Sequence, residues 1–150
     1  MGTFNRLLDA TYEPPHRWEL NTALSFDCDT ISENDIALLK AIGVRINTKG
    51  KITVAKGFET DMASVPRILW NVISPFDTAR AAVIHDYLYA KCREFWADNP
   101  EMTTEVQKCR KVADDVFRDA MESLEPRPSG WKIWACYRAV RVFGTGAIKS

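Results

Sequence analysis

The strongest structural signal in this sequence is an amphipathic helix predicted over Glu101 to Leu124. Apolar residues recur there three and four positions apart, which is the spacing of one face of an α-helix. The stripe consists of Val106, Cys109, Val112, Ala113, Val116, Phe117, Ala120 and Met121. Pro126-Arg127-Pro128 should end the helix, because proline lacks the amide proton that a helix needs.

Two further helices are predicted on either side. Asp77 or Thr78 can cap a helix that runs to about Phe95, with residues 94–100 as the turn of an antiparallel helix pair. Ser129 can cap a third helix that runs through Phe143 and is closed by Gly144.

The first half of the chain has a different pattern, with short β-prone runs separated by turn residues. We expect a strand within residues 18–26, a helix over 32–42 capped by Ser32 and ended by Gly43, and a hairpin that pairs 44–46 with 52–54. Residues 57–67 read as a loop and 68–73 as a short helical turn. The predicted fold is α+β: a small antiparallel β portion, with its hairpin near 44–54, packed on three C-terminal helices.

Composition excludes several classes of protein. With 150 residues, 46% hydrophobic and 27% charged, the chain is expected to form one globular domain over 1–150 rather than a disordered segment. Its 20 Lys and Arg balance 20 Asp and Glu, which argues against a nucleic-acid partner. We predict neither a signal peptide nor a membrane-spanning segment, and hence synthesis in a cytoplasm.

The four cysteines are too dispersed to form a disulfide scaffold or a Cys-x-x-Cys zinc site. They are Cys28, Cys92, Cys109 and Cys136. The antiparallel helix pair brings Cys92 close to Cys109. A disulfide would fit there geometrically, but we expect two reduced, buried thiols.

His85 is the main candidate for chemistry. At 100° per residue it lies at the centre of an apolar helix face, with Tyr89 one turn on and Asp86 at the edge of that face. On the next helix, Asp114 can turn inward at the same height, whereas Asp115 points nearly opposite and should be solvated. A buried carboxylate on one ring nitrogen would leave the other as a general base, and Asp86 could bind a divalent cation.

Three alternatives stay open at this point. His85 could be a core histidine in a structural His-Asp-Tyr clasp between helices, without turnover. Asp61 could be a further metal ligand or catalytic carboxylate, or it could cap the turn into residues 64–67. Ser64 could be a nucleophile, although no nucleophile-elbow motif surrounds it.

The last predicted helix carries Trp131, Trp134, Arg138 and Arg141 along one side. Such an aromatic and basic face suits a membrane surface or a nucleic acid. The commoner arrangement packs the aromatic rings on the core and leaves the arginines in water, and we expect that arrangement here.

The pattern His85-Asp86-x-x-Tyr89, followed by Ala113-Asp114-x-x-Phe117, resembles the paired catalytic helices of phospholipase A2 enzymes, especially the viral type. The resemblance implies that His85 activates a water, that Asp86 binds calcium, and that Asp114 and Tyr89 orient the histidine. It also implies a membrane lipid or another host-envelope substrate. The glycine-rich calcium loop of that family has no counterpart before residue 77.

A wider set of motifs runs from GFxTDxASVPR at residues 57–67 through HDYLY at 85–89 and ADxxF at 113–117 to YxAVRxFG at 137–144. Together these motifs resemble a family of tailed-phage and prophage proteins of unknown function. That resemblance implies a phage origin, with incorporation in the virion left open. Two functions therefore compete: a metal-assisted His-Asp ester hydrolase, and a non-catalytic virion, tail-associated or assembly protein that contacts other phage structural proteins.

Overall fold

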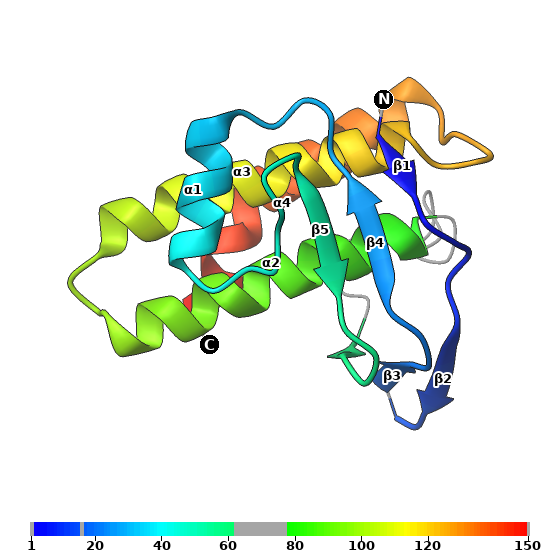
Figure 1. Cartoon of the computed structure of the whole chain (residues 1–150), viewed down its shortest axis with the longest axis horizontal. Helices are drawn as coiled ribbons and strands as arrows, with labels where there is room; N and C mark the ends of the chain where they lie inside the picture. Colours follow the sequence, from blue (N-terminus) through cyan, green and yellow to red (C-terminus); the bar gives the residue numbers. More distant parts are fainter. Residues whose placement is uncertain (1, 16, 62–77, 150) are drawn as a thin grey trace.

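The computed structural model describes residues 2–15, 17–61 and 78–149, and its fold is α+β as predicted (Figure 1). In chain order its elements are β1 (Thr3–Phe4), β2 (Ala10–Glu13), β3 (Arg17–Leu20), β4 (Leu24–Asp27), α1 (Glu33–Ala41), β5 (Lys51–Val54), β6 (Glu59–Thr60), α2 (Ala79–Asp98), α3 (Thr103–Glu122) and α4 (Gly130–Lys149). Ser64, His16 and the helical turn predicted over 68–73 lie outside the described residues.

The described elements stack in layers around the pair α2 and α3. Figure 1 shows the sheet β1–β4–β5 and α1 in front of this pair, with α4 behind it. The core contains apolar side chains from every layer, including Phe26 and Ile52 of the sheet, Leu88 of α2, Phe117 of α3 and Val140 of α4. The α2–α3 pair is therefore covered on both sides, and residues that face between its helices are buried.

The strand predicted within residues 18–26 is wrong as a single strand. Its two halves are β3 and β4, and they belong to different antiparallel sheets, β2–β3–β6 and β1–β4–β5. The chain turns between them at Asn21, whose backbone amide and side-chain amide both donate to Asp9, at 2.9 and 3.0 Å. The backbone bond from Asn21 to Asp9 continues the β2–β3 pairing one residue past Leu20 and Ala10, and after it the chain turns into β4.

The predicted hairpin is confirmed at its turn, at its second arm and in part of the pairing between its arms. Gly50, with a φ of 90°, closes the turn, and β5 follows it. The first arm pairs with β5 through the bridge from Ile46 to Ile52 and through the bond from the Thr53 amide to Arg45 O at 3.0 Å, while the main partner of β5 is β4. Val44 donates its amide to Leu39 at the end of α1, and Arg45 donates its amide to the Tyr87 hydroxyl. The amides of this segment are therefore used elsewhere.

Helix ends follow the sequence signals in α1 and depart from them in α4. Ser32 caps α1 by accepting from the Asp35 amide at 3.1 Å, and Gly43 follows the helix with a φ of 92°. α4 continues through Gly144 to Lys149, so the prediction that Gly144 ends the helix is wrong. None of the described helices is long and apolar enough to cross a membrane.

All four cysteines are buried and reduced, which confirms the expectation for Cys92 and Cys109. Burial raises the pKa of the Cys92 thiol to about 12, and the neighbouring Cys109 adds to that shift. Burial also raises the pKa of Cys28, Cys109 and Cys136 to about 11.

Native thiols should therefore resist modification. Only the thiolate reacts, so we expect almost no reaction with 5,5′-dithiobis(2-nitrobenzoic acid) at pH 8 and four reactive thiols in guanidinium chloride. The absorbance of the nitrothiobenzoate that the reagent releases gives the number of reactive thiols in the native and in the unfolded protein. Fast labelling of a native thiol, or two thiols missing after unfolding without reductant, would contradict the prediction.

Candidate functional site

His85 and Asp114 meet between α2 and α3, as the two helical patterns predict. His85 Nε2 lies 2.8 Å from Asp114 Oδ1, and the Tyr89 hydroxyl donates to the same oxygen at 2.6 Å. The imidazole stacks on the Phe117 ring, with centroids 4.5 Å apart, and contacts the Tyr89 ring on α2. A hydrogen bond and two aromatic contacts thus help to fix the orientation of the ring.

The other carboxylate oxygen of Asp114 binds two arginines that the sequence analysis did not assign to the site. Arg110 Nη1 donates to Oδ2 at 3.2 Å and Arg141 Nη1 donates to it at 2.7 Å. Arg110 is itself buried, and it also donates to the backbone oxygens of Val140 and Arg141 on α4. Asp114 therefore links α2, α3 and α4 through one carboxylate.

This environment keeps Asp114 ionised. Burial by itself would raise the pKa of the carboxyl, but the hydrogen bond and charge of His85, with hydrogen bonds from Tyr89 and Arg141, lower it overall. The pKa of Tyr89 is raised, mainly by burial and then by the Asp114 charge. Since an ionised carboxylate only accepts, Nε2 donates to Asp114, and in the neutral form of the imidazole Nδ1 carries the lone pair.

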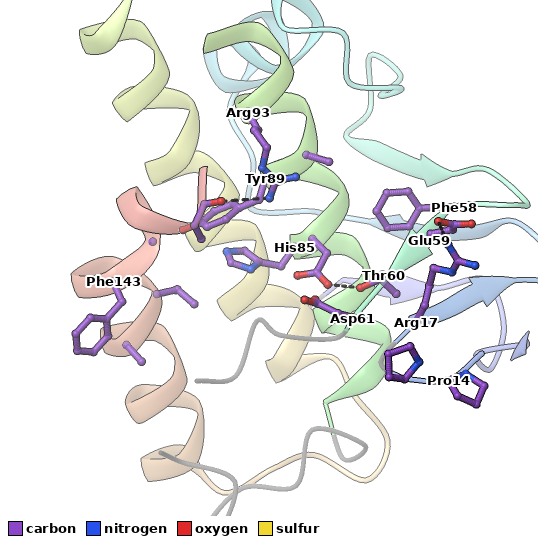
Figure 2. A pocket seen from close by; sticks show the side chains of 17 residues that line it. Pro14, Arg17, Phe58, Glu59, Thr60, Asp61, His85, Tyr89, Arg93 and Phe143 are labelled. Carbon is purple, nitrogen blue, oxygen red and sulfur yellow. Dashed lines mark hydrogen bonds and ion pairs between the residues drawn. The ribbon is translucent and has the colours of Figure 1, made fainter. Parts of the chain in front are cut away.

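The histidine lies in the wall of a pocket of about 840 Å³. Its described lining includes His85, Asp86 and Tyr89 from α2, Asp61 beside β6, and Phe143 from α4. Figure 2 shows Phe58, Glu59 and Arg17 on the strand side, opposite the helices that carry His85 and Phe143. His85 is only 1% exposed, so its ring forms the floor of the pocket rather than projecting into it.

Asp86 and Asp61, the two predicted metal ligands, both line this pocket. Asp86 accepts a hydrogen bond from Thr60 of β6, marked by a dashed line in Figure 2. Asp61 is exposed, and its side chain lies near that bond (Figure 2). Within the described residues, however, no group of three or more His, Cys, Asp or Glu side chains is arranged to hold a metal ion.

Asp115 differs from the expectation of a solvated residue. It is half-buried, accepts from the Tyr137 hydroxyl at 2.6 Å, and pairs with Lys111. Its carboxylate therefore helps to hold α4 on α3.

The arginines of the site carry signals that the sequence analysis did not use. Arg110 stands four residues before Asp114, which is the spacing of an intrahelical ion pair. Arg141 was noted only within a basic helix face and a family motif. No local pattern connects it to Asp114, because that contact depends on how α4 packs.

The fold and the site thus define an α+β protein whose helices enclose a His-Asp pair at a pocket. The chain belongs to the DUF1353 family of proteins of unknown function, whose pattern matches residues 36–140. That range includes His85, Asp86, Tyr89, Asp61 and Asp114. Neither a curated protein nor a solved structure matches the chain.

The ionised Asp114 should be a large contributor to stability. Asp114→Asn leaves the buried Arg110 without its counter-ion, and we expect a loss of about 3 kcal/mol of unfolding free energy. The matched change Asp115→Asn, one residue along α3, should cost under about 1 kcal/mol, because its Lys111 pair is exposed. Urea unfolding at pH 7 measures both, and equal losses would contradict this account.

The lowered pKa of Asp114 also fixes the sign of a pH effect. The stabilisation is fully present above the ordinary carboxyl pKa of about 3.9 and is lost as the pH falls through the lower native pKa. The stability of Asp114→Asn should therefore fall less steeply below pH 4 than that of the wild type.

Gly144 allows α4 to approach this cluster. A Cβ there would lie 2.6 Å from Arg110 Nη1 and closer still to the Tyr89 hydroxyl, so Gly144→Ala should destabilise the protein by about 1–3 kcal/mol. A Cβ at Gly146, on the same helix, meets no atom within 4 Å. Gly146→Ala should instead be neutral or stabilise by up to about 1 kcal/mol. Thermal melting compares the two, and the same sign for both variants would refute the packing argument.

Proposed function

We propose that the protein is a His-Asp hydrolase in which His85 is the general base. The observation that carries the proposal is the 2.8 Å contact of His85 with an ionised, fully hydrogen-bonded Asp114 at the wall of an 840 Å³ pocket. A carboxylate on Nε2 sets the tautomer, so that Nδ1 is the nitrogen able to take a proton. A purely structural ion pair would not need a pocket of this size beside it.

The reaction proposed is hydrolysis of an ester. A water in the pocket transfers a proton to His85 Nδ1 while its oxygen attacks the carbonyl carbon. The charge of Asp114 stabilises the imidazolium that forms. The imidazolium then returns the proton to the leaving alkoxide as the ester bond breaks, which yields an acid and an alcohol and restores neutral His85.

The pocket lining suits an amphiphilic ester. Phe58 and Phe143 provide apolar wall, and Arg93 places a guanidinium on the same lining, where an anionic group of the substrate could bind. Arg17, also in the wall, is already paired with Glu13 and Glu59. A phospholipid ester combines an acyl chain with an anionic phosphate, so it is the substrate we propose, in keeping with the resemblance to phospholipase A2.

A divalent cation, calcium in the phospholipase resemblance, would bind Asp86 and Asp61. The described side chains supply these two carboxylates but not a complete ligand set. No step of the proposed mechanism depends on the cation. Calcium titration by calorimetry on the wild type and on Asp86→Asn tests the assignment.

A phage origin belongs to the same proposal. The motifs between residues 57 and 144 resemble those of the phage and prophage family described above, and on that basis the substrate would be a host-envelope lipid. Synthesis would take place in the host cytoplasm, and incorporation in the virion would bring the enzyme to that envelope.

The second candidate function is a non-catalytic phage virion, tail-associated or assembly protein. Two observations favour it: His85 is only 1% exposed, and Asp114 accepts from four side chains on three helices. A satisfied network of this kind stabilises helix packing whether or not a substrate binds.

Hydrolysis of phospholipid vesicles and of p-nitrophenyl esters separates the two functions. As a general base, His85 should contribute about 10²- to 10⁴-fold to the rate, so His85→Ala should lose nearly all activity. Tyr89→Phe removes only one hydrogen bond to Asp114 and should lose less. Released fatty acid, measured by mass spectrometry, is the readout.

The control for this experiment is Asp115→Asn, which leaves the His85 contacts unchanged and should keep its activity. Circular dichroism checks that each variant folds. Wild-type protein that hydrolyses none of these esters, or a folded His85→Ala variant with full activity, would favour the structural clasp.

A further inference from the structure

The outer face of α4 carries most of the large apolar side chains that are exposed in the described part of the chain. Trp131, Trp134, Val142 and Phe143 are 56 to 66% exposed. At 100° per residue, both tryptophans and Val142 fall within an arc of about 80°. The prediction that the aromatic rings of this helix pack on the core is therefore wrong for Trp131 and Trp134, which are exposed.

The core-facing side of α4 is filled by buried side chains. Ile133, Cys136 and Val140 are buried on the side of α4 opposite the two tryptophans, and Ile148 is buried near the end of the helix. The exposed rings are therefore not needed to hold α4 in place. Contiguous exposed apolar groups of this kind mark a surface that meets another partner.

The charge of α4 indicates what that partner is. Apart from Arg141, which is paired with Asp114, the helix contains Lys132, Arg138 and Lys149 and no Asp or Glu, although acidic and basic residues balance in the whole chain. Arg138 lies inside the tryptophan arc, is exposed, and pairs with no carboxylate among the described residues. The face is thus apolar and cationic together, which is complementary to an apolar surface with negative charge.

We propose that the outer face of α4 docks on the surface of an anionic lipid bilayer. Tryptophan rings settle at the boundary between headgroups and acyl chains, and nearby arginine and lysine side chains attract anionic headgroups. A nucleic acid fits less well. Its binding relies on many phosphate contacts, whereas this arc offers few cations and adds the aliphatic Val142.

This surface borders the pocket of the candidate site. Phe143 lies next to Val142 and also lines the pocket that contains His85 and Tyr89 (Figure 2). Docking through α4 would therefore bring the pocket rim to the lipid. The link to lipid hydrolysis rests on the proposed function, whereas docking can be measured without any turnover.

The test is co-sedimentation of the full-length chain with vesicles of phosphatidylcholine containing phosphatidylglycerol, and with vesicles of phosphatidylcholine alone. We expect binding to the anionic vesicles with a blue shift of tryptophan emission. Trp131→Ala combined with Trp134→Ala should lower the partition coefficient about 10-fold or more. Arg138→Glu should weaken binding several-fold, and added salt should weaken wild-type binding.

Two variants serve as controls. Tyr12→Ala removes an aromatic ring that is 47% exposed on β2, outside α4, and it should bind vesicles like the wild type. His85→Ala should also keep binding, so that loss of hydrolysis with retained docking points to the proposed function alone.

Several outcomes would overturn the docking proposal. These are no wild-type binding to anionic vesicles, equal binding by the double tryptophan variant, or binding to single-stranded DNA instead of vesicles. A wild-type dimer in analytical ultracentrifugation that the double variant converts to a monomer would equally assign the face to a second copy of the chain.

Discussion

The carboxylate of Asp114 is the interaction on which the arrangement of the three long helices depends. It is wholly buried, and a buried charge is costly unless opposite charge and hydrogen bonds surround it. Its four donors come from three helices: His85 and Tyr89 on α2, Arg110 on α3 and Arg141 on α4. Any shift of one helix against the others would leave at least one of these buried groups without its partner.

The same constraint explains the small residues of α4. Arg110 reaches across to two backbone oxygens of α4, and Gly144 stands where a side chain would strike Arg110 and Tyr89. The α4 backbone must therefore come close to the cluster. The glycine that resembles a helix stop in the sequence is in fact a point of close packing in the middle of a helix.

Prediction from sequence was most successful where the information is local. The positions of His85 and Asp114 follow from the periodicity of two helices and the short turn between them, and the Ser32 cap and the Gly43 terminus follow from neighbouring residues. The strand pairing was missed because it depends on contacts far along the chain: Asn21 binds Asp9, and β4 pairs with β5. Arg141 was missed because its contact with Asp114 depends on how α4 packs against α3, which no local pattern indicates.

The tryptophans of α4 show how tertiary packing can reverse a reasonable expectation. A large aromatic ring usually goes to the core, because it contributes the most apolar area. Here the inner face of α4 must leave room for the buried guanidinium of Arg110, which donates to the Val140 oxygen and lies where a side chain at position 144 would be. A tryptophan on that side would displace the ion pairs of Asp114. The buried ion pairs of Asp114 thus exclude bulky rings from the inner face of α4. The packing of the fold does not require the apolar side chains on the outer face, so their role is expected to involve a partner.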